Sequence, residues 1–204
     1  MATSPTTVAR STALWWAGAP GAGQVPDAHL LAAVDGALAG SGAEAELVCT
    51  HVDRSAATPR IGVSLRLTGE PADPAATRSA LARALAGPVV ADGADEAQIV
   101  GPARTALLEA GAGTAGRAVR FPGSTQVSGR TTVADLVAGT AIEKVVGIGV
   151  EAAGTDVVDT GPNGFLRPTL TGGQLTLLVE RTAGGVLQPF EIEDPHVCCE
   201  GGGH

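Results

Sequence analysis

The alternation of side chains between Arg60 and Thr68 is the feature that most restricts how this chain can fold. Positions 61, 63, 65 and 67 carry isoleucine, valine and two leucines, whereas Ser64 and Arg66 stand at the even positions between them. Successive side chains of a β-strand point to opposite faces, so this run predicts a strand with one apolar face. The segment Glu46–Asp53 is predicted to be a second strand, joined to the first by a loop.

Four helices are expected, most of them in the first two-thirds of the chain. Leucine and valine recur at helical spacing after Pro26, and the Gly-Ser-Gly sequence at 40–42 ends this first helix. Asp73 followed by Pro74 is the usual pair of N-cap and first helical residue, and it predicts the start of a second helix. The predicted helices cover residues 26–39, 71–86, 95–110 and 131–137.

Turn signals break the last part of the chain into short segments. Pairs of glycines and a Gly-Pro-Asn-Gly sequence recur after residue 150, and such spacing is typical of antiparallel strands. The predicted strands of this part cover residues 157–158, 165–170, 175–181 and 186–192, and a further strand is predicted before it, at residues 143–151. We therefore predict an α+β fold, in which the helices pack on a mixed, largely antiparallel sheet that ends in a C-terminal β-meander.

The chain divides into three parts by composition. Residues 1–25 are polar and then rich in glycine and proline, and we expect a flexible N-terminal arm there. Residues 26–194 are predicted to form a single α+β domain, with a division into two lobes, 26–115 and 116–194, as the alternative. Residues 195–204 form a tail rich in cysteine and histidine.

Charge and composition exclude several classes of partner. The formal net charge of −8 leaves no basic surface for a nucleic-acid backbone, and the chain has no tyrosine and few other aromatic residues on which bases could stack. No apolar stretch approaches the length of a membrane span. Three cysteines are too few for a disulfide framework. We therefore expect a cytoplasmic protein that binds neither nucleic acid nor a membrane, and the sequence leaves protein partners and homo-oligomers open.

No known catalytic or cofactor-binding motif is present with the secondary structure that it requires around it. The glycines of Gly111–Gly116 match G-x-G-x-x-G, but a helix is predicted before them and a strand after them, the reverse of a dinucleotide-binding loop. We expect a helix-to-strand linker and no nucleotide cofactor. The nucleophile motif G-x-S-x-G is absent from the sequence, and no Ser, His and Asp arrangement stands out.

The soft metal ligands gather in two short segments. The first holds Cys49 and His51, and the second holds His196, Cys198 and Cys199, with His204 just beyond. Residues i and i+2 of a strand share a face, so each segment would present a thiol and an imidazole together. Two thiolates and two imidazoles suit a tetrahedral zinc or a softer ion. The candidate metal ligands are therefore Cys198, Cys199, His196, His204, Cys49 and His51.

Two alternatives to a metal site remain open on the residues alone. Cys49 follows two apolar residues and could be buried as a small apolar side chain. The tail could be a mobile segment without a role, since Pro195 and three consecutive glycines flank its ligands.

The tail also resembles the C-terminal segments of two classes of enzyme. Cys198-Cys199-Glu200-Gly201 is similar to the Cys-Cys tail with which mercuric reductases capture a soft metal ion, and adjacent redox residues end some thioredoxin reductases. The resemblance covers these four residues only, and the chain is too short for the flavin domain of those enzymes. It implies an exposed thiolate pair that binds a thiophilic ion or exchanges with a disulfide. Nearby carboxylates should raise the thiol pKa values, which favours metal capture over redox catalysis.

The sequence thus predicts a non-catalytic or accessory protein that binds a zinc-like or copper-like ion through its C-terminal tail. The first alternative is a small-molecule enzyme of bacterial specialised metabolism, since the alanine- and glycine-rich composition indicates a high-GC bacterial genome. Its pocket would lie near Arg167, where Phe165 and Phe190 either line a pocket or close the end of the core. The second alternative is a protein-interaction module.

Overall fold

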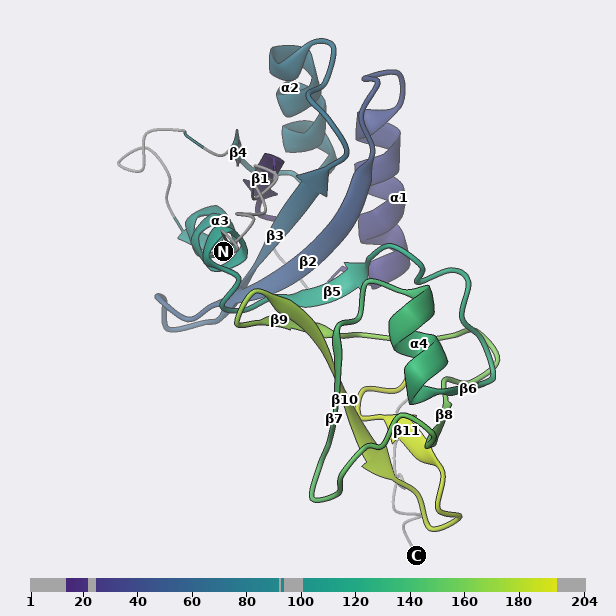
Figure 1. The fold of residues 1–204 in the computed structure, drawn as a ribbon. Helices are drawn as coiled ribbons and strands as arrows, with labels where there is room; N and C mark the ends of the chain where they lie inside the picture. Colours follow the sequence, from purple (N-terminus) through teal and green to yellow (C-terminus); the bar gives the residue numbers. More distant parts are fainter. Residues whose placement is uncertain (1–13, 22–24, 92, 94–100, 194–204) are drawn as a thin grey trace, which may run out of the picture.

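Residues 14–21, 25–91, 93 and 101–193 are described by the computed structural model of this chain (Figure 1). The helices are α1 (Asp27–Leu38), α2 (Pro74–Ala84), α3 (Gly101–Ala112) and α4 (Val133–Gly139). The strands are β1 (Leu14–Gly18), β2 (Ala45–Asp53), β3 (Arg60–Leu67), β4 (Val89–Ala91), β5 (Arg117–Arg120), β6 (Arg130–Thr132), β7 (Lys144–Gly147), β8 (Val157–Asp159), β9 (Thr169–Thr171), β10 (Gln174–Arg181) and β11 (Leu187–Pro189).

The strands of the described part form one mixed, mostly antiparallel sheet. Its order is β4-β1-β3-β2-β5-β9-β10-β11-β8-β6, and β7 joins it by pairing with β10. Only the β7–β10 and β8–β11 pairs among the described strands are parallel. The last strands β9, β10 and β11 pair antiparallel in chain order. The predicted α+β fold with a C-terminal β-meander is therefore confirmed.

Local signals set the ends of the helices where they were expected. Asp73 is the N-cap of α2, and its carboxylate accepts a hydrogen bond from the backbone N–H of Ala76 at 2.9 Å. Thr132 caps α4 in the same way through the N–H of Asp135. These side chains satisfy amide groups that the first turn of a helix leaves without partners.

Helices cover both faces of the first half of the sheet. Figure 1 shows α1 and α2 on one side of β2 and β3, and α3 on the other. Val63 and Leu65 of β3 pack toward α1 and α2. The even positions of the same strand face α3, since a side chain added at Gly62 would meet the backbone of Pro102. The alternation of side chains predicts one apolar face for β3, and the structure shows that both faces of this strand are buried.

The prediction of a flexible arm is wrong for residues 14–18. These residues form β1, which lies between β4 and β3 and pairs with both. Trp15 is buried in the core on the α3 side and Trp16 in the core on the α1 and α2 side. Neighbouring side chains of a strand point to opposite faces, so two adjacent tryptophans fit a strand that is covered on both sides.

Candidate functional site

A buried chain of hydrogen bonds crosses the contact between α3 and the sheet. His51 of β2 lies at its centre: Nδ1 is 2.9 Å from a carboxylate oxygen of Glu109 on α3, and Nε2 is 2.8 Å from the hydroxyl of Ser64 on β3. His51 and Ser64 are almost fully buried, whereas the side chain of Glu109 is 32 % exposed. Burial lowers the pKa of His51, and the hydrogen bond that its ring donates to the carboxylate of Glu109 only partly opposes this shift.

The order Ser64–His51–Glu109 is that of a serine hydrolase triad, but the serine is not placed for catalysis. Ser64 stands in the middle of β3 with 0 % exposure, underneath α3, so a substrate cannot reach its hydroxyl. A nucleophile must lie at a reacting carbon, with donors for the oxyanion nearby. The arrangement instead gives hydrogen-bond partners to two buried side chains, Ser64 and His51, and buried polar side chains require such partners.

The predicted pair of soft ligands lies on this same network. Cys49 and His51 share a face of β2 as expected, because both lie against Gly116. Cys49 is 0 % exposed, and burial raises the pKa of its thiol to about 12. Both ring nitrogens of His51 already have partners. A metal ion needs a thiolate and a free imidazole nitrogen, so neither side chain is open to one in this arrangement.

The other predicted ligands, His196, Cys198, Cys199 and His204, lie outside the described residues. Within residues 14–193, apart from the undescribed stretches, no three His, Cys, Asp or Glu side chains are grouped to hold a metal ion.

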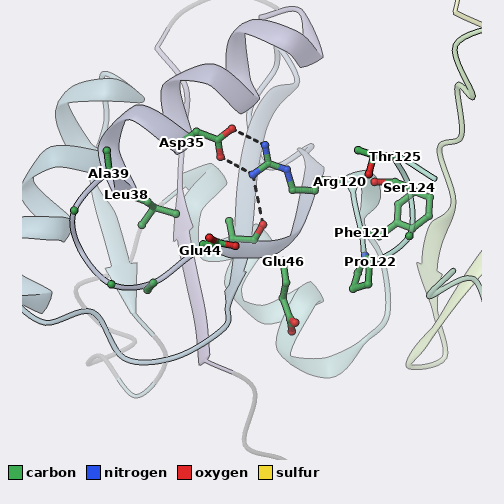
Figure 2. Close-up of a pocket in the computed structure, with 15 residues that line it drawn as sticks. Asp35, Leu38, Ala39, Glu44, Glu46, Arg120, Phe121, Pro122, Ser124 and Thr125 are labelled. Atoms are coloured by element: carbon green, nitrogen blue, oxygen red, sulfur yellow. Dashed lines mark hydrogen bonds and ion pairs between the residues drawn. The ribbon is translucent and has the colours of Figure 1, made fainter. Parts of the chain in front are cut away.

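An open groove of about 920 Å³ lies between two loops (Figure 2). Arg120 and Asp35 line this groove, and Figure 2 shows their contact. Both terminal nitrogens of Arg120 bind the carboxylate of Asp35, at 2.6 and 2.7 Å. This hydrogen bond lowers the pKa of Asp35 and raises that of Arg120. Glu46 on the same wall is paired with Arg66. Asp35 and Arg120 are therefore paired with each other, and Glu46 is paired with a residue outside the lining of the groove.

A second hollow, of about 610 Å³, lies at the N-terminus of α1. Asp27, the first residue of α1, lies between two arginines: its carboxylate accepts hydrogen bonds from Arg117 of β5 at 3.1 Å and from Arg167 at 2.7 Å. Burial raises the pKa of Asp27, but the hydrogen bonds from both arginines outweigh it, so the pKa lies below its ordinary value. On its other side Arg117 binds the carboxylate of Glu191.

Aromatic and aliphatic side chains complete the wall of this hollow. The guanidinium of Arg167 lies 3.9 Å from the ring centroid of Phe165, which is a cation–π contact. Phe190 and Ile192 also line the hollow and are 58 % and 42 % exposed. Arg167, Phe165 and Phe190 therefore line a pocket, which is the first of the two roles that their sequence left open.

Sequence reasoning did not find Asp27, Arg117 or Glu191 in this cluster, nor Ser64 and Glu109 in the buried network. Arg117 is 90 residues from Asp27 and 74 from Glu191 along the chain. No local pattern links positions so far apart. The only signal in the sequence was the bulky pair Phe165 and Arg167 among smaller residues.

The comparisons with known proteins gave no significant match to a family model, a curated protein or a solved structure. Among the described helices, none has both the length and the apolar character that crossing a membrane requires.

Proposed function

We propose that this protein binds a thiophilic metal ion through its C-terminal tail, with Cys198 and Cys199 as the principal ligands and His196 and His204 as additional ones. The observation that carries the proposal is the concentration of soft donors between residues 196 and 204. Two thiolates and two imidazoles are a complete tetrahedral set for zinc and also suit softer ions.

The burial of Cys49 and His51 supports a site formed within the tail alone. A ligand from β2 would first have to give up the hydrogen bonds of His51 and leave the core beneath α3. The spacing of the tail allows a local site, because His196 and Cys198 are two residues apart and Cys199 follows directly. The proposal therefore leaves out the two ligands of β2.

The charges around the tail favour metal binding over thiol–disulfide exchange. Glu193, Asp194 and Glu200 stand close to the two cysteines in the sequence. Negative charges disfavour a free thiolate and raise thiol pKa values. A bound cation reverses this effect because it interacts favourably with the thiolates and drives their deprotonation. The same carboxylates thus weaken a redox nucleophile and do not prevent metal capture.

Titration of the whole chain with Zn²⁺ and Cd²⁺ under reducing conditions tests the proposal. We expect one ion per chain, with thiolate-to-metal charge-transfer absorption for Cd²⁺, and loss of both in a Cys198→Ser/Cys199→Ser variant. Cys49→Ala is the matched control, since it removes the third cysteine and should leave binding unchanged. Equal metal content with and without the tail thiols, or loss of binding in Cys49→Ala, would contradict the proposal.

A further inference from the structure

We propose that the hollow at the N-terminus of α1 is a binding site for a small organic monocarboxylate with an apolar body, held by Arg117 and Arg167, and that the side chain of Glu191 occupies the carboxylate position when no ligand is bound. This inference is independent of the metal-binding tail. It rests on the hydrogen bonds, burial and charges of described residues only.

Arg167 has a donor that its neighbours do not use. Its Nε binds Asp27 and its Nη1 binds the carbonyl oxygen of Leu166, but Nη2 has no hydrogen-bond partner among the described residues. Every fully buried side-chain nitrogen or oxygen in the described part has a partner, so this Nη2 is not fully buried. Arg167 lines the hollow and its side chain is 14 % exposed, and we infer that this free donor serves a ligand there.

Arg117 shows that the site already accepts a carboxylate. Its guanidinium uses one edge for Asp27 and the other for Glu191, whose two carboxylate oxygens lie 2.8 Å from Nε. This forked geometry is the one that arginine uses to recognise planar carboxylates. Asp27 is fixed by two arginines, whereas Glu191 has one arginine partner and a side chain that is 42 % exposed. Glu191 is therefore the carboxylate that a ligand would replace.

The charges select a ligand with a single negative charge. When Glu191 leaves, Arg117 and Arg167 carry two positive charges and Asp27 one negative charge, so this hydrogen-bonded cluster keeps one positive charge. Glu193, which also lines the hollow, is exposed and accepts a hydrogen bond from Asn163, and it adds a further negative charge at the wall. A second negative charge on the ligand would lie near the carboxylate of Asp27 and would have no positively charged partner, which a buried charge requires. A phosphate dianion or a dicarboxylate is therefore disfavoured.

The remaining wall selects the body of the ligand. The ring of Phe165 lies against the guanidinium of Arg167, and the exposed side chains of Phe190 and Ile192 line the same hollow. A hollow of about 610 Å³ falls in the range of small-molecule sites, which combine apolar walls with a few fixed polar groups. An aromatic or branched body would cover these side chains while the carboxylate meets the arginines.

Calorimetric titration of the full chain with benzoate, and with benzamide as its uncharged match, tests the inference. We expect benzoate to bind at least about tenfold more tightly than benzamide, because charge-assisted hydrogen bonds are the stronger ones. Glu191→Gln should tighten benzoate binding, since it removes the internal competitor. A gain of this kind cannot come from a folding defect. Phe190→Ala, at an exposed position, should weaken binding.

Arg167→Lys keeps the positive charge but loses the planar set of guanidinium donors, and it should weaken benzoate binding without unfolding the chain. Arg130→Gln is the matched control, because Arg130 forms an exposed ion pair with Asp159 in a neighbouring hollow. Equal affinity for benzoate and benzamide, the absence of benzoate binding, or unchanged affinity in Glu191→Gln would overturn the inference.

Discussion

Replacing Ser64 by alanine tests whether the buried hydrogen bonds of His51 stabilise the contact between α3 and the sheet. The substitution removes one oxygen atom and leaves almost no cavity, but it leaves Nε2 of His51 without the hydroxyl that lies 2.8 Å away. His51 is 2 % exposed, so water does not easily replace the lost partner. An unpaired polar group of this kind costs about 1–3 kcal/mol. For a chain of this length, that corresponds to a fall in Tm of roughly 2–12 °C.

Urea denaturation at pH 7.5 measures this loss as a shift of the midpoint at unchanged slope. Ser79→Ala is the matched control: Ser79 is exposed on α2, and its replacement should change the free energy of unfolding by no more than about 0.5 kcal/mol. His51→Leu combined with Ser64→Ala should lose less than the sum of the single variants, because both members of the pair are then apolar. A Ser64→Ala variant as stable as Ser79→Ala, or strictly additive losses, would show that the hydrogen bonds of His51 do not stabilise this contact.

Two further predictions follow from the same region and from α1. Because burial lowers the pKa of His51 in the folded state, the unfolded chain binds the proton more readily. The stability from this residue is complete above its unfolded pKa of about 6.5 and is lost as pH falls from there through the folded pKa. Urea midpoints between pH 7.5 and 5.5 should therefore fall more for the parent chain than for His51→Gln, and parallel curves would count against this. Gly62→Ala should destabilise the chain by about 1–3 kcal/mol or more in thermal unfolding, because the new Cβ would lie 2.1 Å from the carbonyl oxygen of Pro102. Gly36→Ala, exposed within α1 with no atom near its Cβ, should instead stabilise by roughly 0.5–1 kcal/mol, and equal effects of the two substitutions would show that the contact with α3 is not what limits position 62.

Short-range patterns predicted the elements of this fold well. The alternation around Ser64 gave β3, and the capping residues Asp73 and Thr132 gave the starts of α2 and α4. These signals depend on hydrogen bonds and side-chain directions between residues only a few positions apart. The meander was predictable for the same reason, because its turns are local. Residues 14–18 were assigned wrongly because the glycine and proline next to them outweighed the two tryptophans.

That Cys49 and His51 share a face of a strand is predictable from their spacing, because side-chain alternation follows from the geometry of neighbouring residues. The packing of the folded chain, and no local pattern, places α3 over this face and puts Glu109 and Ser64 within hydrogen-bond distance of the two ring nitrogens of His51. It likewise decided that Asp27, Arg117 and Glu191 meet at one hollow. Such contacts depend on which strands pair and which helix packs on them, and that choice is made by the burial of apolar surface over the whole chain.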